Sequence, residues 1–134
     1  MWRFNQVRAI TVLKARYFRL LDTKDWDRFA QLFTPDVEVD VTGEGMELLQ
    51  GVDAFVATLQ EQLAGAVTVH HGHMPEILLT SPLNHARGIW AMEDEIWWPE
   101  GSPVRHMEGA GHYHETYVRN AAGWRISSMR LTRL

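Results

Sequence analysis

Histidines are the residues of this sequence best suited to chemistry, and three occur together in the segment His70-His71-Gly72-His73. An imidazole with an ordinary pKa of about 6.5 can take up or release a proton near neutral pH. Side-chain alternation along a regular strand would place His71 and His73 on one face and His70 on the other. Pro75 favours a bulge or a strand edge, which could shift this alternation, so the sequence does not decide which face each histidine occupies. Three such close histidines favour a functional role for at least one of them.

A second histidine pair, His112 and His114, shares one face of a later predicted strand. A His-x-His pair can ligate a metal, but a third ligand must come from another strand, and no motif specifies one. We therefore expect no metal. The opposite face of the same segment carries Tyr113, Glu115 and Tyr117, which could equally line a cavity.

One acidic residue falls among large apolar side chains. The face of this predicted strand consists of Trp90, Met92, Asp94, Ile96 and Trp98. A carboxylate in such surroundings is costly to bury unless it is paired or protonated, which makes Asp94 a pocket candidate with Arg130 or a histidine as its partner. The alternative is that Asp94 lies on the exposed face of the sheet. Glu93 and Glu95 flank it, so this acidic run has side chains on both faces and does not decide which face is buried.

Helices are predicted to position these residues in the first half of the chain. Apolar residues from Val7 to Leu21 recur at three- and four-residue spacing, with Lys14 among the charged residues assigned to the other side. The segment 22–25 ends this helix, and a short second helix over 26–33 ends at Thr34-Pro35-Asp36. A third helix runs from Gly51 to near Gly65.

Strands are predicted for most of the rest. The expected strands cover residues 37–41, 67–71, 76–79, 85–98, 106–118 and 124–131. Gly43 and Gly45 mark a loop, and residues 81–84 mark a turn. Helices followed by consecutive antiparallel strands predict an α+β fold, in which a sheet that curls around the helices leaves a pocket on its concave face.

Composition limits the class of protein. The 134 residues predict a single domain over 1–134, with 46% hydrophobic residues, 22% charged residues and a net charge of -4. Interspersed charges exclude a basic stripe for nucleic acid, and no apolar run is long enough to span a membrane. The absence of cysteine, of a signal-peptide core and of nucleotide-binding glycine loops predicts a cytoplasmic protein without an organic cofactor.

Several motifs follow the order of a known family. They are YFRLLD (17–22), WDRF (26–29), FTPDV (33–37), VHHGHMPEI (69–77), ARGIWAMED (86–94) and GHYHETY (111–117). Together they resemble SnoaL-like domains of the nuclear-transport-factor-2-like superfamily over nearly the whole chain. The resemblance implies a cone, in which a curved antiparallel or mixed sheet packs against three helices and encloses a pocket. Such a fold hosts many chemistries.

The motif spacing is most similar to scytalone dehydratase and bile acid dehydratase. This resemblance implies catalytic roles for Tyr17, Asp22 and His70, with His71 as the alternative if the strand register shifts by one. Asp22 would orient His70 or act as a base, and Tyr17 would donate a hydrogen bond to a carbonyl. Core packing for Tyr17 and helix capping for Asp22 are the structural alternatives.

Five further residues are expected to contact the substrate. They are His71, Trp90, Asp94, His112 and Tyr113. The expected function is a cofactor-independent dehydratase or isomerase that acts on a cyclic hydroxy-ketone, an aromatic polyketide or a steroid-like compound. A non-catalytic ligand carrier and a structural subunit of an oxygenase are the alternatives. The expected partners are a small apolar or aromatic ligand and, because proteins of this fold commonly pair through the outer sheet, further copies of the chain in a homodimer or higher homo-oligomer.

Overall fold

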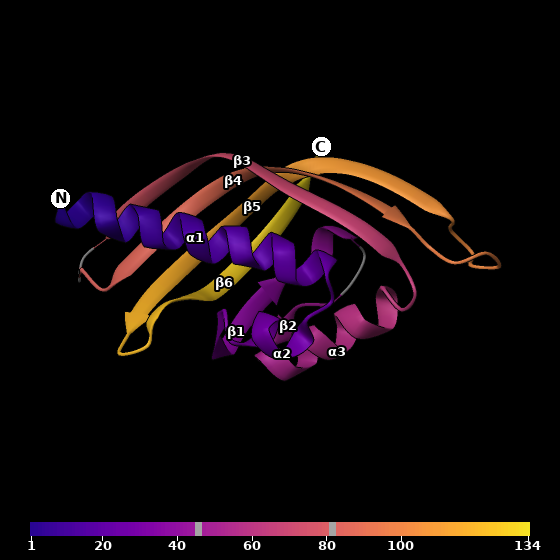
Figure 1. The fold of residues 1–134 in the computed structure, drawn as a ribbon, viewed down its shortest axis with the longest axis horizontal. Coiled ribbons are helices and arrows are strands. Elements are labelled where there is room, and N and C mark those ends of the chain that lie inside the picture. The colour runs from indigo at the N-terminus through magenta and orange to yellow at the C-terminus, as the bar shows by residue number, and fades with distance from the viewer. Residues whose placement is uncertain (45–46, 81–82) are drawn as a thin grey trace.

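One strongly curved sheet, with a long helix against its inner face, dominates the computed structural model of the protein (Figure 1). The structure describes residues 1–44, 47–80 and 83–134. The elements in chain order are α1 (Trp2–Asp22), α2 (Trp26–Ala30), β1 (Phe33–Asp40), the 3₁₀ helix η1 (Thr42–Glu44), β2 (Leu49–Gln50), α3 (Val52–Gln62), β3 (Val67–Thr80), β4 (His85–Trp97), β5 (His106–Asn120) and β6 (Gly123–Arg133).

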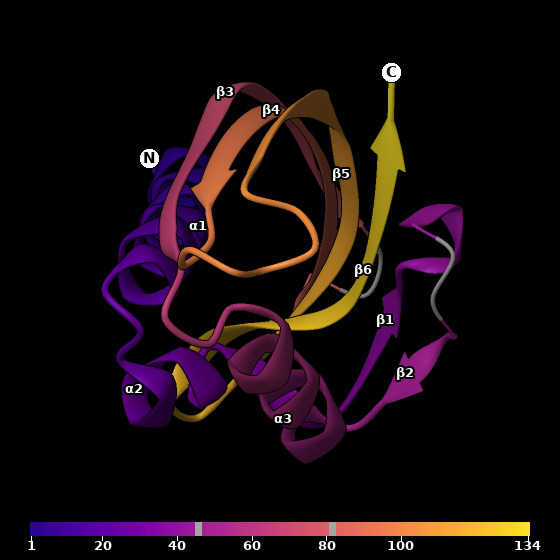
Figure 2. The same ribbon diagram turned by 90° about the vertical axis from the view of Figure 1, so that its right-hand side faces the viewer.

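The sheet is mixed, and its strand order is β2-β1-β6-β5-β4-β3. β1 runs parallel to β6, and the other neighbouring strands are antiparallel. Seen from its end in Figure 2, the sheet curls so that α1 lies near β3, while α3 lies across the opening below. This arrangement confirms the predicted α+β cone with three helices in the N-terminal half.

Alternating burial along the strands defines the inner face of the sheet. On β4 the side chains of Trp90, Met92, Asp94 and Ile96 are buried, whereas Glu93 between them is exposed. This confirms the predicted shared face and places Asp94 inside, because alternate residues of a strand point to the same side. β3 continues through Pro75, with a register shift between His73 and Glu76, as the proline suggested.

Several predicted boundaries were wrong. The second helix ends at Ala30, and Phe33 begins β1 instead of completing a helical face. β1 also contains Pro35, which lies in the register shift of the pairing with β6 between Phe33 and Glu38, where its missing N–H is not needed. The two-residue strand β2 was not predicted. Gly43 lies in η1, while Gly45 and the first two residues of the turn predicted at 81–84 fall outside the described residues.

The first helix ends as predicted, but one of its residues was assigned to the wrong side. Lys24 adopts a positive φ of 57°, which stops α1, and the Asp25 carboxylate accepts a hydrogen bond from the Arg28 N–H to start α2. Lys14 is fully buried beside Leu13 and Tyr17, although it was expected to face solvent. No helix in the described parts of the chain is long and apolar enough to cross a membrane.

Candidate active site

A histidine–aspartate pair joins α1 to β3. The Nδ1 atom of His70 lies 2.7 Å from Oδ1 of Asp22, and the backbone N–H of His70 donates to Oδ2 of the same carboxylate at 2.9 Å. The Thr68 hydroxyl donates a third hydrogen bond to Asp22 at 2.9 Å. The His70 side chain is only 7% exposed, so Asp22 holds its ring with Nε2 as the nitrogen left for chemistry.

An ion pair between buried Asp94 and partly exposed Arg133 faces this second nitrogen. The two carboxylate oxygens of Asp94 accept hydrogen bonds of 2.9 and 2.8 Å from the guanidinium of Arg133, and Oδ2 lies 3.8 Å from Nε2 of His70. Glycine at position 109 makes room for the pair, because a Cβ there would lie 2.7 Å from Asp94 Oδ1. The partner of Asp94 is therefore Arg133 together with His70, whereas Arg130 lies on the outer face.

Two tyrosines bring hydroxyl groups to the same region. The rings of Tyr17 and Tyr113 pack edge to face with centroids 5.6 Å apart, and a hydrogen bond joins their side chains. Burial, as the largest cause, raises the pKa of both phenols above the ordinary value, and the mutual hydrogen bond raises the pKa of Tyr17 further. Both phenols are therefore protonated at neutral pH, with the Tyr17 hydroxyl donating to the Tyr113 oxygen and the Tyr113 hydroxyl able to donate to a ligand.

A cavity of about 370 Å³ opens between α1, α3 and the inner face of the sheet. Its polar lining side chains are Tyr17, Tyr113, Gln62 and Arg133, and the remaining lining residues are apolar. His70 does not line the cavity. It faces Asp94, and Asp94 accepts hydrogen bonds from Arg133, which does line the cavity. A small, largely apolar ligand with one or two oxygens fits such a cavity.

A buried lysine network lies beneath the tyrosines, and the sequence interpretation missed it. Lys14 Nζ donates to Glu115 Oε2 at 2.6 Å, the Tyr117 hydroxyl donates to Glu115 Oε1 at 2.7 Å, and Trp90 Nε1 donates to the Tyr117 oxygen at 3.0 Å. Burial lowers the pKa of Lys14 to about 8, although Glu115 opposes this shift. The signal was available, since Lys14 sits three residues before Tyr17 on the same helical side.

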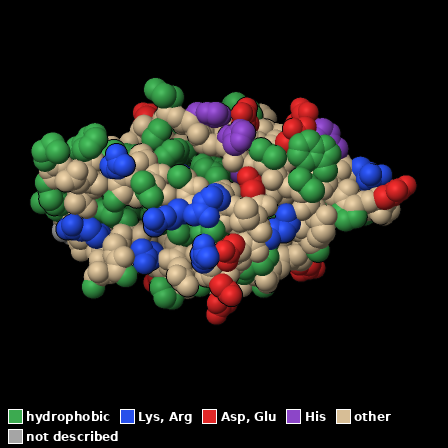
Figure 3. All heavy atoms as spheres, in the orientation of Figure 1, with side chains coloured by type: hydrophobic (Ala, Val, Ile, Leu, Met, Phe, Trp, Pro, Cys, Tyr) green, Lys and Arg blue, Asp and Glu red, His purple; other side chains and the backbone are tan. Residues whose placement is uncertain are grey.

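Two predicted substrate contacts need correction, because strand alternation turns His71 and His112 to the outer face. The His71 side chain is 60% exposed, with its Nδ1 3.6 Å from Glu93. His112 lies beside His114, with ring centroids 6.4 Å apart. The Trp90 side chain is hydrogen-bonded to Tyr117 of the Lys14 network, whereas Tyr113 lines the cavity directly. Figure 3 shows histidines beside acidic side chains on the side of the molecule where β3 and β4 lie.

One group of described residues has ligand atoms spaced for a metal ion. Potential ligand atoms of Glu95, His106 and Glu108 lie within 4.8 Å of one another. His106 is already paired with Glu95 at 2.8 Å, and its ring stacks on Trp97 at 5.4 Å. The group lies on the outer face at the far end of β4 and β5, so it adds nothing to the cavity.

Comparison with known proteins places this architecture in a family. The model of the SnoaL-like domain matches residues 2–130, which is nearly the whole chain. The chain belongs to the SnoaL-like family. A relative of this SnoaL-like protein is the "Probable cyclase FGR4" of Gibberella zeae, which is 28% identical over 130 residues that cover 90% of this chain and 86% of the relative.

Solved structures support the same cone fold. A candidate scytalone dehydratase from Novosphingobium aromaticivorans superposes with a TM-score of 0.85 and 21% identity, covering 98% of this SnoaL-like chain and 86% of the other. A type 2 hexachlorocyclohexane dehydrochlorinase (LinA) superposes with a TM-score of 0.84 and 20% identity over the same shares. At these identities the likeness establishes the fold and leaves the chemistry to the site.

Proposed function

We propose that this protein is a cofactor-independent lyase or isomerase that moves a proton next to the carbonyl of a cyclic hydroxy-ketone. The observation that carries the proposal is His70, fixed by Asp22 on one side and directed at Asp94 and Arg133 on the other. The family membership and the names of its relatives, a cyclase, a dehydratase and a dehydrochlorinase, support small-molecule chemistry of this class. Aromatic polyketides and steroid-like compounds with this functional group remain within the proposal.

The proposed dehydration needs one base and one oxygen donor. Nε2 of His70 takes the proton from the carbon next to the carbonyl, and the electron pair moves to the carbonyl oxygen, which accepts a hydrogen bond from the Tyr17–Tyr113 pair. When the enolate re-forms the carbonyl, the C–O bond to the β-hydroxyl breaks. The departing hydroxide takes the proton back from His70 and leaves as water. Asp22 stabilises the imidazolium between these two steps.

A direct test uses 3-hydroxy-1-tetralone, which loses water to give the fluorescent product 1-naphthol. We expect wild-type protein to accelerate this reaction and His70→Ala or Asp22→Asn to lower kcat by about 10²–10⁴-fold, the usual contribution of a general base. His71→Ala, next in the chain but on the outer face, is the matched control and should keep wild-type activity. Equal rates for His70→Ala, Asp22→Asn and wild type would refute the proposal.

A ligand carrier is the second candidate, and one observation favours it: His70 does not line the cavity in this structure. In a carrier, the Tyr17 and Tyr113 hydroxyls would orient the ligand without turnover. Binding of 1-naphthol that Asp22→Asn leaves unchanged, together with no dehydration by wild type, would establish this role.

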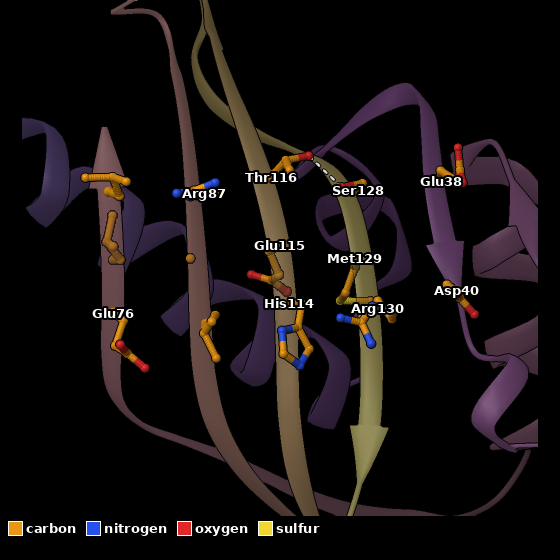
Figure 4. Close-up of a pocket in the computed structure, with 14 residues that line it drawn as sticks. Glu38, Asp40, Glu76, Arg87, His114, Glu115, Thr116, Ser128, Met129 and Arg130 are labelled. Carbon is orange, nitrogen blue, oxygen red and sulfur yellow. Dashed lines mark hydrogen bonds between the residues drawn. The ribbon is translucent and has the colours of Figure 1, made fainter. Parts of the chain in front are cut away.

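We further propose that a second copy of the chain covers the outer face of the sheet. This face has a hollow of about 760 Å³, whose lining includes Arg87 on one side, Glu38 and Asp40 on the other, and His114 and Arg130 between them (Figure 4). Side chains of both signs on one face allow a self-complementary contact across a two-fold axis. Light scattering should give twice the monomer mass, and a monomeric mass would refute this.

Cytoplasmic location and the single-domain organisation also stay predictions.

A further inference from the structure

Lys14 is a buried charge that the proposed proton transfer does not use. Its Nζ lies 3.6 Å from the ring centroid of Tyr17 and 3.6 Å from that of Tyr113. Both tyrosines line the 370 Å³ cavity, whereas Lys14 itself is fully buried. The ammonium group is therefore sandwiched between two cavity-lining rings, directly behind the surface that a ligand would contact.

The partner of Lys14 is Glu115, which lies two residues after Tyr113 on the same buried face of β5. Glu115 Oε2 accepts the 2.6 Å hydrogen bond from Lys14, and its Oε1 accepts a hydrogen bond from Tyr117, which is in turn bonded to Trp90. These bonds fix both ends of the ion pair. The pair is neutral as a whole, yet its positive end lies between Tyr17 and Tyr113 in a region without water access.

Stability alone gives little reason for this arrangement. Replacement of a buried ion pair by apolar residues of similar size is often neutral or stabilising, because desolvation offsets the attraction between the charges. A fixed dipole does contribute where negative charge develops nearby, because it is already oriented and a dry site screens it weakly. The cation between the two rings favours partial negative charge on their hydroxyl oxygens and so strengthens the hydroxyls as donors. The charge of Glu115 acts in the opposite direction and raises the pKa of both phenols.

We propose that Lys14, anchored by Glu115, is a positioning residue that polarises the Tyr17–Tyr113 pair toward a ligand oxygen that carries negative charge. This inference deepens the proposed function, since the enolate oxygen would be that ligand atom. It also makes a claim that holds without any turnover: the cavity should favour the ionised form of a bound phenol.

The probe for this claim is 4-nitrophenol, whose ionised form has a distinct absorption. Its ionisation is followed by pH titration in the presence of saturating wild-type protein or of the double variant Lys14→Met/Glu115→Gln. The double change removes both charges, so no unpaired charge is buried, and the amide that replaces the Glu115 carboxylate can still accept from Tyr117. We expect the apparent pKa of the bound probe to be about one unit lower in wild type, a tenfold difference in the ratio of ionised to neutral probe.

A purely structural role for Lys14 would change the affinity for both forms of the probe and leave the ionisation ratio unchanged, which would overturn the inference. Phe18→Leu is the packing control, because the Phe18 ring lies 5.0 Å from Lys14 Nζ and carries no charge. It should leave the ratio as in wild type. Circular dichroism checks folding, and Lys14→Leu/Glu115→Gln, which also removes both charges, serves if the first double variant does not fold.

The two proposals can fail separately. If wild type does not dehydrate 3-hydroxy-1-tetralone but the probe shift depends on Lys14, the lysine role stands and the enzymatic proposal falls. If dehydration depends on His70 while the probe ratio ignores Lys14, the enzymatic proposal stands and the lysine is structural.

Discussion

Asp22 does more than cap the end of a helix. Its carboxylate accepts hydrogen bonds from the Thr68 hydroxyl and the His70 backbone, and one oxygen contacts the His70 ring at 2.7 Å. The backbone and hydroxyl contacts fix the carboxylate itself, so the ring contact is held in one geometry. In neutral His70 this geometry places the proton on Nδ1, because a carboxylate accepts and cannot donate.

This contact makes a prediction that needs no substrate. ¹⁵N NMR of the ring nitrogens at pH 8 should show neutral His70 predominantly as the Nδ1–H tautomer, and Asp22→Asn should give a mixture of tautomers, because an amide can donate or accept. His71→Ala identifies the neighbouring signals and should leave the His70 tautomer unchanged. A His70 ring in the Nε2–H form in wild type would contradict the proposed role of Asp22.

At the scale of elements, the spacing between α1 and β3 decides whether Asp22 can reach His70. Gly72 lies on β3 opposite Phe18 of α1, and a Cβ at this position would approach Phe18 Cζ to 2.6 Å and Trp90 Cε3 to 3.4 Å. The helix can pack closely on the strand because this glycine has no side chain, and the same contact brings the end of α1 to His70.

We expect Gly72→Ala to lower the free energy of unfolding by about 1–3 kcal/mol through overpacking between α1 and β3. Chemical denaturation measures this change. Phe18→Leu removes the colliding ring atoms, so the double variant Phe18→Leu/Gly72→Ala should lose less stability than the sum of the two single variants. Additive losses would show that Gly72 does not set this spacing.

For the whole molecule, stability must vary with pH because Lys14 is buried. Burial lowers its pKa from 10.5 to about 8, so between these values the folded state holds fewer protons than the unfolded state. Unfolding free energy therefore rises with pH in this window from Lys14 alone. The buried tyrosines act in the opposite direction above about pH 10, since their raised pKa values keep protons on the folded state.

We expect the Tm of wild type minus the Tm of Lys14→Met/Glu115→Gln to increase as the pH rises from 7 to 9.5. Comparison with the variant removes the contributions of the other titrating groups to a first approximation. Differential scanning calorimetry at half-unit steps measures the difference. A difference that stays constant or falls over this range would show that Lys14 is not buried with a lowered pKa.

Much of the fold could be predicted from local patterns. Period-two alternation identified β4 and the shared face of Trp90 and Asp94, and helical periodicity placed Tyr17 inside. These predictions succeed because burial of apolar side chains follows the geometric period of each element. Phe33 shows the limit: its spacing after Phe29 fits a helix, but pairing of its segment with β6 makes it the start of β1.

The sequence by itself determined the residue types for acid–base chemistry, the family motifs and the periodicity that turns most core residues inward. Tertiary structure decided which distant groups meet: His70 with Asp22, Asp94 with Arg133 instead of Arg130, and Lys14 with Glu115. The physical reason is that a polar residue carries no periodic signal of its own partner. Its burial becomes favourable only when the fold supplies an opposite charge or a hydrogen bond, and that depends on sheet curvature and register.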